Sequence, residues 1–160
     1  MTREPMTIQG EIRLKEELQD LKRHQRPRII REIAEARAHG DLSENAEYHA
    51  AREEQSLTEA RIALLEEKLS CAQVIDTTSL SLDAGGKIVF GTTVELMNLA
   101  TDEEVTYQIV GEMEANIKNK LVSVTSPLAR ALIGREEGDV VTVQAPGGEV
   151  EYEILGVDYR

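Results

Sequence analysis

The first half of the chain, from about residue 8 to residue 75, places apolar side chains at the three- and four-residue spacing of an α-helix. On the first arm, the 4-3 spacing is followed by Leu14, Leu18 and Leu21 and resumed by Ile30, Ile33 and Arg37. The seam expected on the second arm consists of Leu57, Leu65, Leu69 and Ala72, with Ala60 and Ile62 beside it. Between the arms, Gly40 suits the left-handed residue that closes a helix, so the chain is expected to reverse at residues 40–43. Two helices joined by so short a connection must run antiparallel, which predicts a helical hairpin.

Pro27 interrupts the first arm of this hairpin. Because proline removes a backbone donor, the helix is expected to kink or break briefly at that point. An arm of about thirty residues, at about 1.5 Å per residue, reaches roughly 45 Å. The hairpin is therefore expected to protrude, with few places to build a broad core.

From about residue 80 the pattern changes to β-branched runs separated by turn residues. The runs are FGTTVELMNL, EEVTYQIVG, KLVSVTS, DVVTVQAP and GEVEYEILGV. PGGE at residues 146–149 predicts a hairpin turn, and PLARALIG at 127–134 predicts a short helix. The chain is thus predicted to be α+β, with an antiparallel coiled-coil hairpin over residues 1–76 and a mostly antiparallel β globule over 77–160. TSLSLDAGG, residues 78–86, is the expected linker.

Acidic residues outnumber basic ones, 30 to 18, for a formal net charge of -12. Such a chain repels duplex phosphate, so a nucleic-acid contact must be local or come through a partner protein. The single cysteine, Cys71, cannot form an intrachain disulfide, and no apolar run approaches the roughly 18 residues of a membrane span. A cytoplasmic protein is expected. With one Phe and no Trp, a base-stacking platform is disfavoured.

Basic side chains concentrate in the first arm, where six Lys or Arg residues face only two Glu between residues 22 and 37. One interpretation is a solvated helix face with ion pairs four residues apart, such as Arg31 with Glu35. The other is a basic stripe that leads toward the turn and guides a nucleic-acid strand. The residues alone leave both open.

Two carboxylates stand three residues apart in the turn GDLSEN, residues 40–45. Asp41 is expected to be the N-cap of the second helix, with Glu44 at N3 in a capping box. Alternatively, the turn projects both side chains outward to share a hard cation, typically Mg²⁺. Two carboxylates are too few to hold Mg²⁺ tightly, so other ligands would come from another molecule. The spacing does not decide between the two roles.

The longer string AEARAHGDLSENAEYHAAREEQ, residues 34–55, closely resembles the hairpin tip of bacterial transcript cleavage factors of the Gre type, and its AEYHAARE portion resembles the GreA subgroup. The resemblance continues through RPRIIREIAEARAHGD, KLSCAQVID and VTSPLARALIGREEGDVVTVQAPGGEVEYEI, over nearly the whole chain. It implies an N-terminal antiparallel coiled coil and a C-terminal domain of FKBP-like fold. It also implies a monomeric elongation factor that enters the secondary channel of RNA polymerase. There it would stimulate the polymerase's own hydrolysis of the 3′ end of backtracked RNA, without being an enzyme itself.

The same resemblance implies roles for residues at the tip. Asp41 and Glu44 would help to hold a Mg²⁺ ion shared with the polymerase active site and orient the attacking water. Arg37, Arg52 and Tyr48 match tip positions, and we expect them to bind the extruded RNA 3′ end; a surface ion-pair role is the alternative for the two arginines. Tip support is expected from Leu42, Ser43 and Asn45, the first as an apolar contact in the channel and the others as water-positioning or capping residues.

In the globular half, TSP at residues 125–127 matches the loop by which the family grips a coiled coil of the polymerase's largest subunit. The polymerase-binding residues implied are Thr125, Ser126 and Pro127. The same residues also suit a helix start, with Ser126 as N-cap and Pro127 at N1. Both roles are compatible, because a rigid cap can present a binding surface.

Two other functions compete with this interpretation. A prolyl isomerase is suggested by the FKBP-like fold, but fold does not determine function, and the four aromatic residues of the second half are too few for an aromatic prolyl pocket. A protein of the same architecture could instead occlude the polymerase channel without promoting cleavage. Relatives of that sort depart from the family tip, whereas Asp41 and Glu44 match it.

Overall fold

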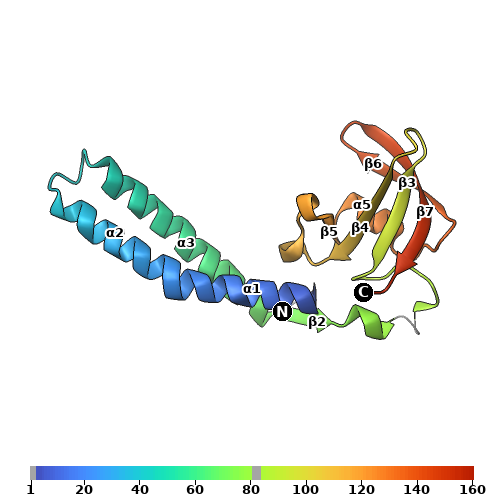
Figure 1. Cartoon of the computed structure of the whole chain (residues 1–160), viewed down its shortest axis with the longest axis horizontal. Helices are drawn as coiled ribbons and strands as arrows, with labels where there is room; N and C mark the ends of the chain where they lie inside the picture. The colour runs from blue at the N-terminus through green and yellow to red at the C-terminus, as the bar shows by residue number, and fades with distance from the viewer. Residues whose placement is uncertain (1–2, 81–83) are drawn as a thin grey trace. The chain divides into compact units, whose positions relative to one another are not determined.

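A computed structural model describes residues 3–80 and 84–160 of the chain, which divides into two compact units (Figure 1). The hairpin unit is Ile12–Cys71, and the sheet unit is Met1–Glu11 with Ala72–Arg160. These limits differ from the expected division at residue 76, because β1 (Glu4–Thr7) and β2 (Ala72–Ile75) pair in parallel and both belong to the sheet unit.

The first residues of the expected linker, 78–80, belong to the 3₁₀ helix η2 (Thr77–Leu80), where Thr77 is buried. Residues 81–83 of the expected linker lie outside the described residues. Across residues 3–80 and 84–160, no helix combines the length and the apolar character needed to cross a membrane.

The hairpin is built from two helical arms. The first arm runs through α1 (Ile8–Asp20), the π-helical turn η1 (Leu21–Gln25) and α2 (Arg26–Ala38). The second arm is α3 (Ala46–Ser70), which runs back beside α2 (Figure 1). The predicted antiparallel hairpin is confirmed. Just before Pro27 the arm forms a π-helical turn, which the expected kink or break at Pro27 did not include.

This π-helical turn shifts the apolar seam by one residue. Continued from Leu21, the 4-3 pattern would reach residues 28, 32 and 35, but the buried side chains of α2 are Ile29, Ile33 and Ala36. The N–H of Arg26 donates to the carbonyl of Leu21, a bond that spans five residues instead of four. A π turn therefore takes up one additional residue and returns the apolar side chains to the seam.

The seam prediction was correct at some positions and wrong at others. Ile33 and Leu65 are buried as expected. Ile30 and Leu57 are 53% and 66% exposed, so the prediction that they belong to the seam is wrong. Ala51 packs with the α2 residues in the small apolar cluster nearest the tip.

The sheet unit carries a five-stranded sheet in the order β5-β4-β3-β7-β6. Its strands are β3 (Thr93–Asn98), β4 (Glu104–Val110), β5 (Leu121–Ser123), β6 (Val140–Ala145) and β7 (Gly148–Asp158). All neighbours are antiparallel except β4 and β5, which run parallel. The predicted α+β class is confirmed, as are the PGGE turn, which joins β6 to β7, and the short helix α5 (Pro127–Leu132).

One apolar core holds the sheet and α5 together. Leu96, Ile109 and Ile154 from the strands meet Leu132 of α5, and all four side chains are at most 1% exposed. Burial of this kind stabilises by about 1.5–3 kcal/mol per large apolar side chain. The core fixes the loops at the ends of the strands, including the loop before α5.

Candidate functional site at the hairpin tip

The tip is the loop of residues 39–45 between α2 and α3, and Asn45 fastens it at both ends. The side-chain oxygen of Asn45 accepts a hydrogen bond from the N–H of Tyr48 at 3.0 Å, which makes it the N-cap of α3. Its amide nitrogen donates to the carbonyl of Ala36 in α2 at 2.7 Å. Gly40 has a φ of 104°, the left-handed conformation expected for the residue that follows α2.

The predicted capping box of Asp41 and Glu44 is wrong. Because α3 begins only at Ala46, Asp41 lies too far from the helix to cap it, and Glu44 precedes the N-cap. Instead, one carboxylate oxygen of Asp41, Oδ1, accepts hydrogen bonds from the N–H and the hydroxyl of Ser43, at 3.1 and 2.8 Å. This local turn shapes the loop, a role typical of aspartate.

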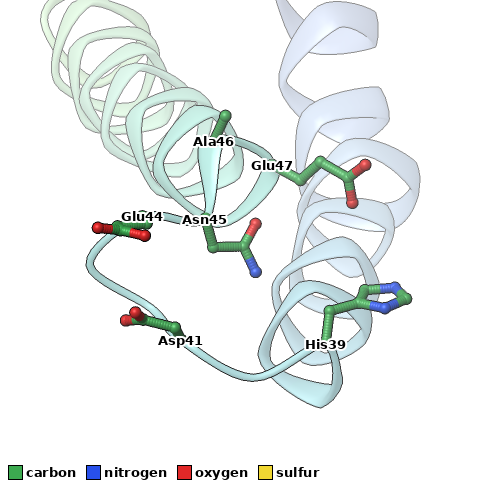
Figure 2. A pocket seen from close by; sticks show the side chains of 6 residues that line it. All are labelled: His39, Asp41, Glu44, Asn45, Ala46 and Glu47. Atoms are coloured by element: carbon green, nitrogen blue, oxygen red, sulfur yellow. The ribbon is translucent and has the colours of Figure 1, made fainter.

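The two carboxylates lie on the same side of the loop. Figure 2 shows Asp41 and Glu44 extending away from the helices, while His39 and Glu47 lie toward the other side. An open hollow at the tip is lined by His39, Asp41, Glu44, Asn45, Ala46 and Glu47. Both carboxylate residues are exposed, and neither caps a helix.

Carboxylate oxygens are the ligands that Mg²⁺ prefers in proteins, so this pair suits a hard cation. Among residues 3–80 and 84–160, no group of three or more His, Cys, Asp or Glu side chains is arranged to hold a metal ion. Asp41 and Glu44 by themselves offer two carboxylates. Tight binding of Mg²⁺ at this place therefore needs ligands from a second molecule.

Leu42 and Ser43 lie between the two carboxylate residues in the loop, and both are exposed. The carbonyl of Ser43 lies 3.1 Å from Nε2 of His49, which adds a second link between the loop and α3. Sequence reasoning did not identify this link, because nothing in the spacing of the two residues indicates it. Leu42 is 38% exposed and is not part of the apolar cluster of the hairpin, as its position in the turn suggested.

Three residues expected to bind RNA lie close behind the tip. The Arg37 guanidinium lies 5.9 Å from the centre of the Tyr48 ring, and Tyr48 packs on the apolar cluster of the hairpin. Arg52 follows one turn later on α3 and is exposed. In the part of the chain that the structure describes, neither arginine takes part in an ion pair, so both positive charges are available to a ligand.

Part of the basic stripe on the first arm is neutralised by acids of the second. The ion pairs between the arms are Lys22 with Glu66 (3.4 Å), Arg26 with Glu59 (2.8 Å), Arg28 with Glu54, and Arg61 with Glu17 (2.7 Å). The predicted pair of Arg31 with Glu35 is not found among the described residues, although Arg28 and Glu32 form such a pair at 2.8 Å. The predicted kind of pair, four residues apart on one helix, is thus found for Arg28, whereas Lys22 and Arg26 pair with acids of the other arm, which was not predicted.

In the sheet unit, the residues expected to bind polymerase form a rigid helix start. The Ser126 hydroxyl accepts a hydrogen bond from the N–H of Ala129 at 3.2 Å, and Pro127 is the first residue of α5. The hydroxyl groups of Thr125 and Ser123 lie 2.7 Å apart. The predicted N-cap is confirmed; the contact with polymerase stays a prediction.

Two family models match the chain. "Transcription elongation factor, N-terminal" matches residues 4–74, and "Transcription elongation factor, GreA/GreB, C-term" matches residues 83–159. The chain belongs to the GreA/GreB family of transcription elongation factors. In this GreA/GreB chain the acidic tip falls within the N-terminal match, and the Ser126 cap falls within the C-terminal one.

Relatives of this GreA/GreB chain are similar over its whole length. It is 62% identical to transcription elongation factor GreA of Thioalkalivibrio sulfidiphilus and 64% identical to that of Alkalilimnicola ehrlichii, each over 159 residues and 99% of both chains. Among solved structures, GreA factor homolog 1 (Gfh1) of Thermus thermophilus is 27% identical over 97% of this chain and 98% of its own, with a TM-score of 0.43. Membership of the GreA/GreB family rests on the sequence matches.

Proposed function

We propose that this chain stimulates RNA polymerase to hydrolyse the 3′ end of backtracked RNA, which rescues arrested elongation complexes. The observation that carries the proposal is the tip, where Asp41 and Glu44 extend to the same side of an exposed loop and neither caps a helix. Membership of the GreA/GreB family and the high identity to GreA proteins support it. In this proposal the chain supplies two ligands, and the polymerase supplies the rest of the site.

The two carboxylates fit a Mg²⁺ ion shared with the polymerase. When bound, the ion supplies a water of lowered pKa and stabilises negative charge on the reacting phosphate. Asp41 accepts hydrogen bonds from Ser43 through Oδ1, so its second oxygen, Oδ2, would be available to hold the ion. Asn45 keeps the loop fixed to both helices, so that the pair is presented without a large ordering cost.

The rest of the hairpin suits delivery into a deep channel. At about 1.5 Å per residue, the 25 residues of α3 extend roughly 38 Å. In the secondary channel, Leu42 would contact an apolar wall, and Arg37, Tyr48 and Arg52 would hold the extruded RNA 3′ end. The rigid start of α5 at Thr125, Ser126 and Pro127 would grip the coiled coil of the polymerase's largest subunit.

The test is cleavage of RNA in a stalled, backtracked polymerase complex with Mg²⁺ present. Asp41→Asn keeps the acceptor for Ser43, and Glu44→Gln keeps the size of the side chain, so both preserve the loop while removing charge. We expect each to reduce stimulated cleavage at least about 10-fold, since even the outer-shell partners of a metal typically contribute 10–100-fold. Circular dichroism and polymerase binding should be unchanged.

The matched control is Glu47→Gln, which removes one charge from the same hollow but on the side away from the pair. It should retain cleavage. If both tip variants cleave normally, the carboxylates only shape the loop. If the wild type binds polymerase and blocks the channel without raising cleavage, the chain is an occluding inhibitor instead.

A further inference from the structure

Glu114 is a buried carboxylate in the sheet unit, far from the tip in sequence. It ends the 3₁₀ helix η3 (Glu112–Glu114) and is 5% exposed. Its carboxylate accepts hydrogen bonds from the N–H of Thr7 at 3.0 Å, from the Thr7 hydroxyl, and from the N–H of Gly111 at 2.8 Å. Three donors compensate for the desolvation of this charge, which would otherwise be costly.

These bonds complete the cap of α1 from another part of the chain. The Thr7 hydroxyl accepts a hydrogen bond from the N–H of Gly10 at 3.0 Å, as an N-cap does from the third residue of a helix. In a capping box, the third residue also carries a Glu or Gln that bonds back to the N-cap N–H. Here that third residue is Gly10, which has no side chain. Glu114, 107 positions after Thr7, supplies the carboxylate instead.

Gly10 and Gly111 lie so close to their neighbours around the Glu114 carboxylate that neither position has space for a Cβ atom. A Cβ atom on Gly10 would lie 1.9 Å from Oε1 of Glu114, and one on Gly111 would lie 2.4 Å from the carbonyl oxygen of Pro5. The same carboxylate also caps η3 through Gly111. Within the sheet unit, one side chain therefore ties the first turn of α1 to η3.

We propose that Glu114 is a positioning residue for transcript cleavage, because it clamps the first turn of α1 and so restricts the directions in which the hairpin arm can leave that turn. α1 begins within the sheet unit and continues beyond Glu11 as the first helix of the hairpin. A rotation of about 5° at the base of an arm of about 45 Å moves its end by roughly 4 Å. A misplacement of about 1 Å at a reacting centre can already reduce a rate about 100-fold.

The clamp is tested first without polymerase, by the distance between two spin labels. In a Cys71→Ser background, labels are attached at the exposed positions Glu53 in α3 and Thr142 in β6, each replaced by cysteine. Glu114→Gln should broaden the distance distribution, because an amide cannot accept from all three donors. Glu112→Gln, at an exposed position of the same 3₁₀ helix, should leave it unchanged.

A second variant guards against a folding defect in Glu114→Gln. Thr7→Val preserves the shape of the side chain but removes the hydroxyl that donates to Glu114 and accepts from Gly10. It should broaden the distribution in the same direction. An unchanged distribution in both variants overturns the clamp.

The consequence for cleavage rests on the proposed function and is measured separately. At saturating protein, Glu114→Gln should lower stimulated cleavage about 10- to 100-fold. The protein concentration that gives half of the maximal stimulation should change little, because the substitution leaves the proposed polymerase-binding residues at the start of α5 unchanged. Val143→Ala loosens the sheet core at a position outside the clamp and serves as the control. It should lower the Tm and keep cleavage at saturation.

The outcomes separate the two proposals. The inference is overturned, and Glu114 is only a structural residue, in either of two cases. In the first, Glu114→Gln stimulates cleavage normally at saturating protein. In the second, Val143→Ala lowers stimulated cleavage as much as Glu114→Gln does. If the wild type itself fails to stimulate cleavage, the proposed function fails. The label distances then still decide whether Glu114 is a clamp.

Discussion

Asn45 is the residue that gives the tip loop its shape, because its amide group bonds to both arms of the hairpin. Asn45→Ala removes an N-cap as well as the bond to the Ala36 carbonyl, so the free energy of unfolding of the hairpin should fall by about 1 kcal/mol or more. Asp41→Ala should change it by less than about 0.5 kcal/mol, because its bonds lie within an exposed turn. Urea unfolding followed at 222 nm measures both. Equal losses would contradict the assignment of the cap to Asn45.

At Gly10 we expect replacement by alanine to destabilise the protein, the opposite of its usual effect inside a helix. Replacing a glycine inside a helix by alanine normally stabilises the helix by about 1 kcal/mol. At Gly10 the new Cβ would displace a carboxylate that three hydrogen bonds hold, so Gly10→Ala should destabilise the sheet unit by about 1–3 kcal/mol. Gly147→Ala, which meets no atom within 4 Å, is the control. A rise in Tm for Gly10→Ala would show that the Glu114 side chain can move away from the new Cβ at little cost.

At this scale the sequence identified the chemistry of the tip better than its geometry. Asp41 and Glu44 were identified from their spacing in the turn, the resemblance to a family favoured the metal-binding role, and Figure 2 shows both on the same side of the loop. The cap was misassigned because Asp41 and Asn45 both suit an N-cap, and only the length of the loop decides between them. Glu114 was missed because its partner Thr7 lies 107 positions away, and no local pattern marks a pairing over that distance.

The π-helical turn is the element-scale feature with the clearest consequence. Because η1 takes up one additional residue, deleting the exposed His24 should convert the arm to a continuous α-helix with the seam intact. The free energy of unfolding of the hairpin should then change by less than about 1 kcal/mol. Deleting Arg31 instead rotates Ile33 by about 100° relative to Ile29 and should destabilise strongly. Similar losses in the two deletion variants would contradict the register argument.

Ion pairs between the arms predict a dependence on pH. The Arg26 guanidinium, hydrogen-bonded to Glu59, holds the pKa of that carboxyl below its usual range. A lowered folded-state pKa contributes stability above the unfolded pKa, and this contribution is lost as the pH falls through the folded value. The stability difference between wild type and Glu59→Gln should therefore shrink on acidification below the usual range of glutamate, and also in high salt. If the stability difference between wild type and Glu59→Gln changed neither with pH nor with salt concentration, the pairing of Arg26 with Glu59 would be contradicted.

Periodicity in the sequence predicted the helices of the hairpin, the strands and the short helix α5, because each repeats its pattern over several residues. It did not predict η1. In the sequence, a one-residue shift of the apolar positions is compatible with a break, a kink or a π turn of the helix. Pro27 favoured a break or a kink, because proline lacks a backbone donor. The parallel pairing of β1 with β2 was also missed, since four-residue strands carry almost no period.

At the scale of the whole molecule, the chain divides into two compact units, and each contains fully buried apolar side chains. Leu132 lies in the core of the sheet unit and Leu65 is fully buried in the hairpin unit, and each is 0% exposed. Replacing either by alanine should cost about 2–5 kcal/mol, but only within its own unit. The chain is therefore expected to unfold in two steps that single substitutions move independently.

Two signals distinguish these steps. In a Tyr48→Phe background, the tyrosines that remain are all in the sheet unit, so near-ultraviolet dichroism reports that unit, while the signal at 222 nm is dominated by the hairpin helices. Leu132→Ala should lower the Tm seen by the tyrosines and leave the helical transition in place, and Leu65→Ala should do the reverse. If both signals shift together in either variant, the two units unfold as one and the prediction is wrong.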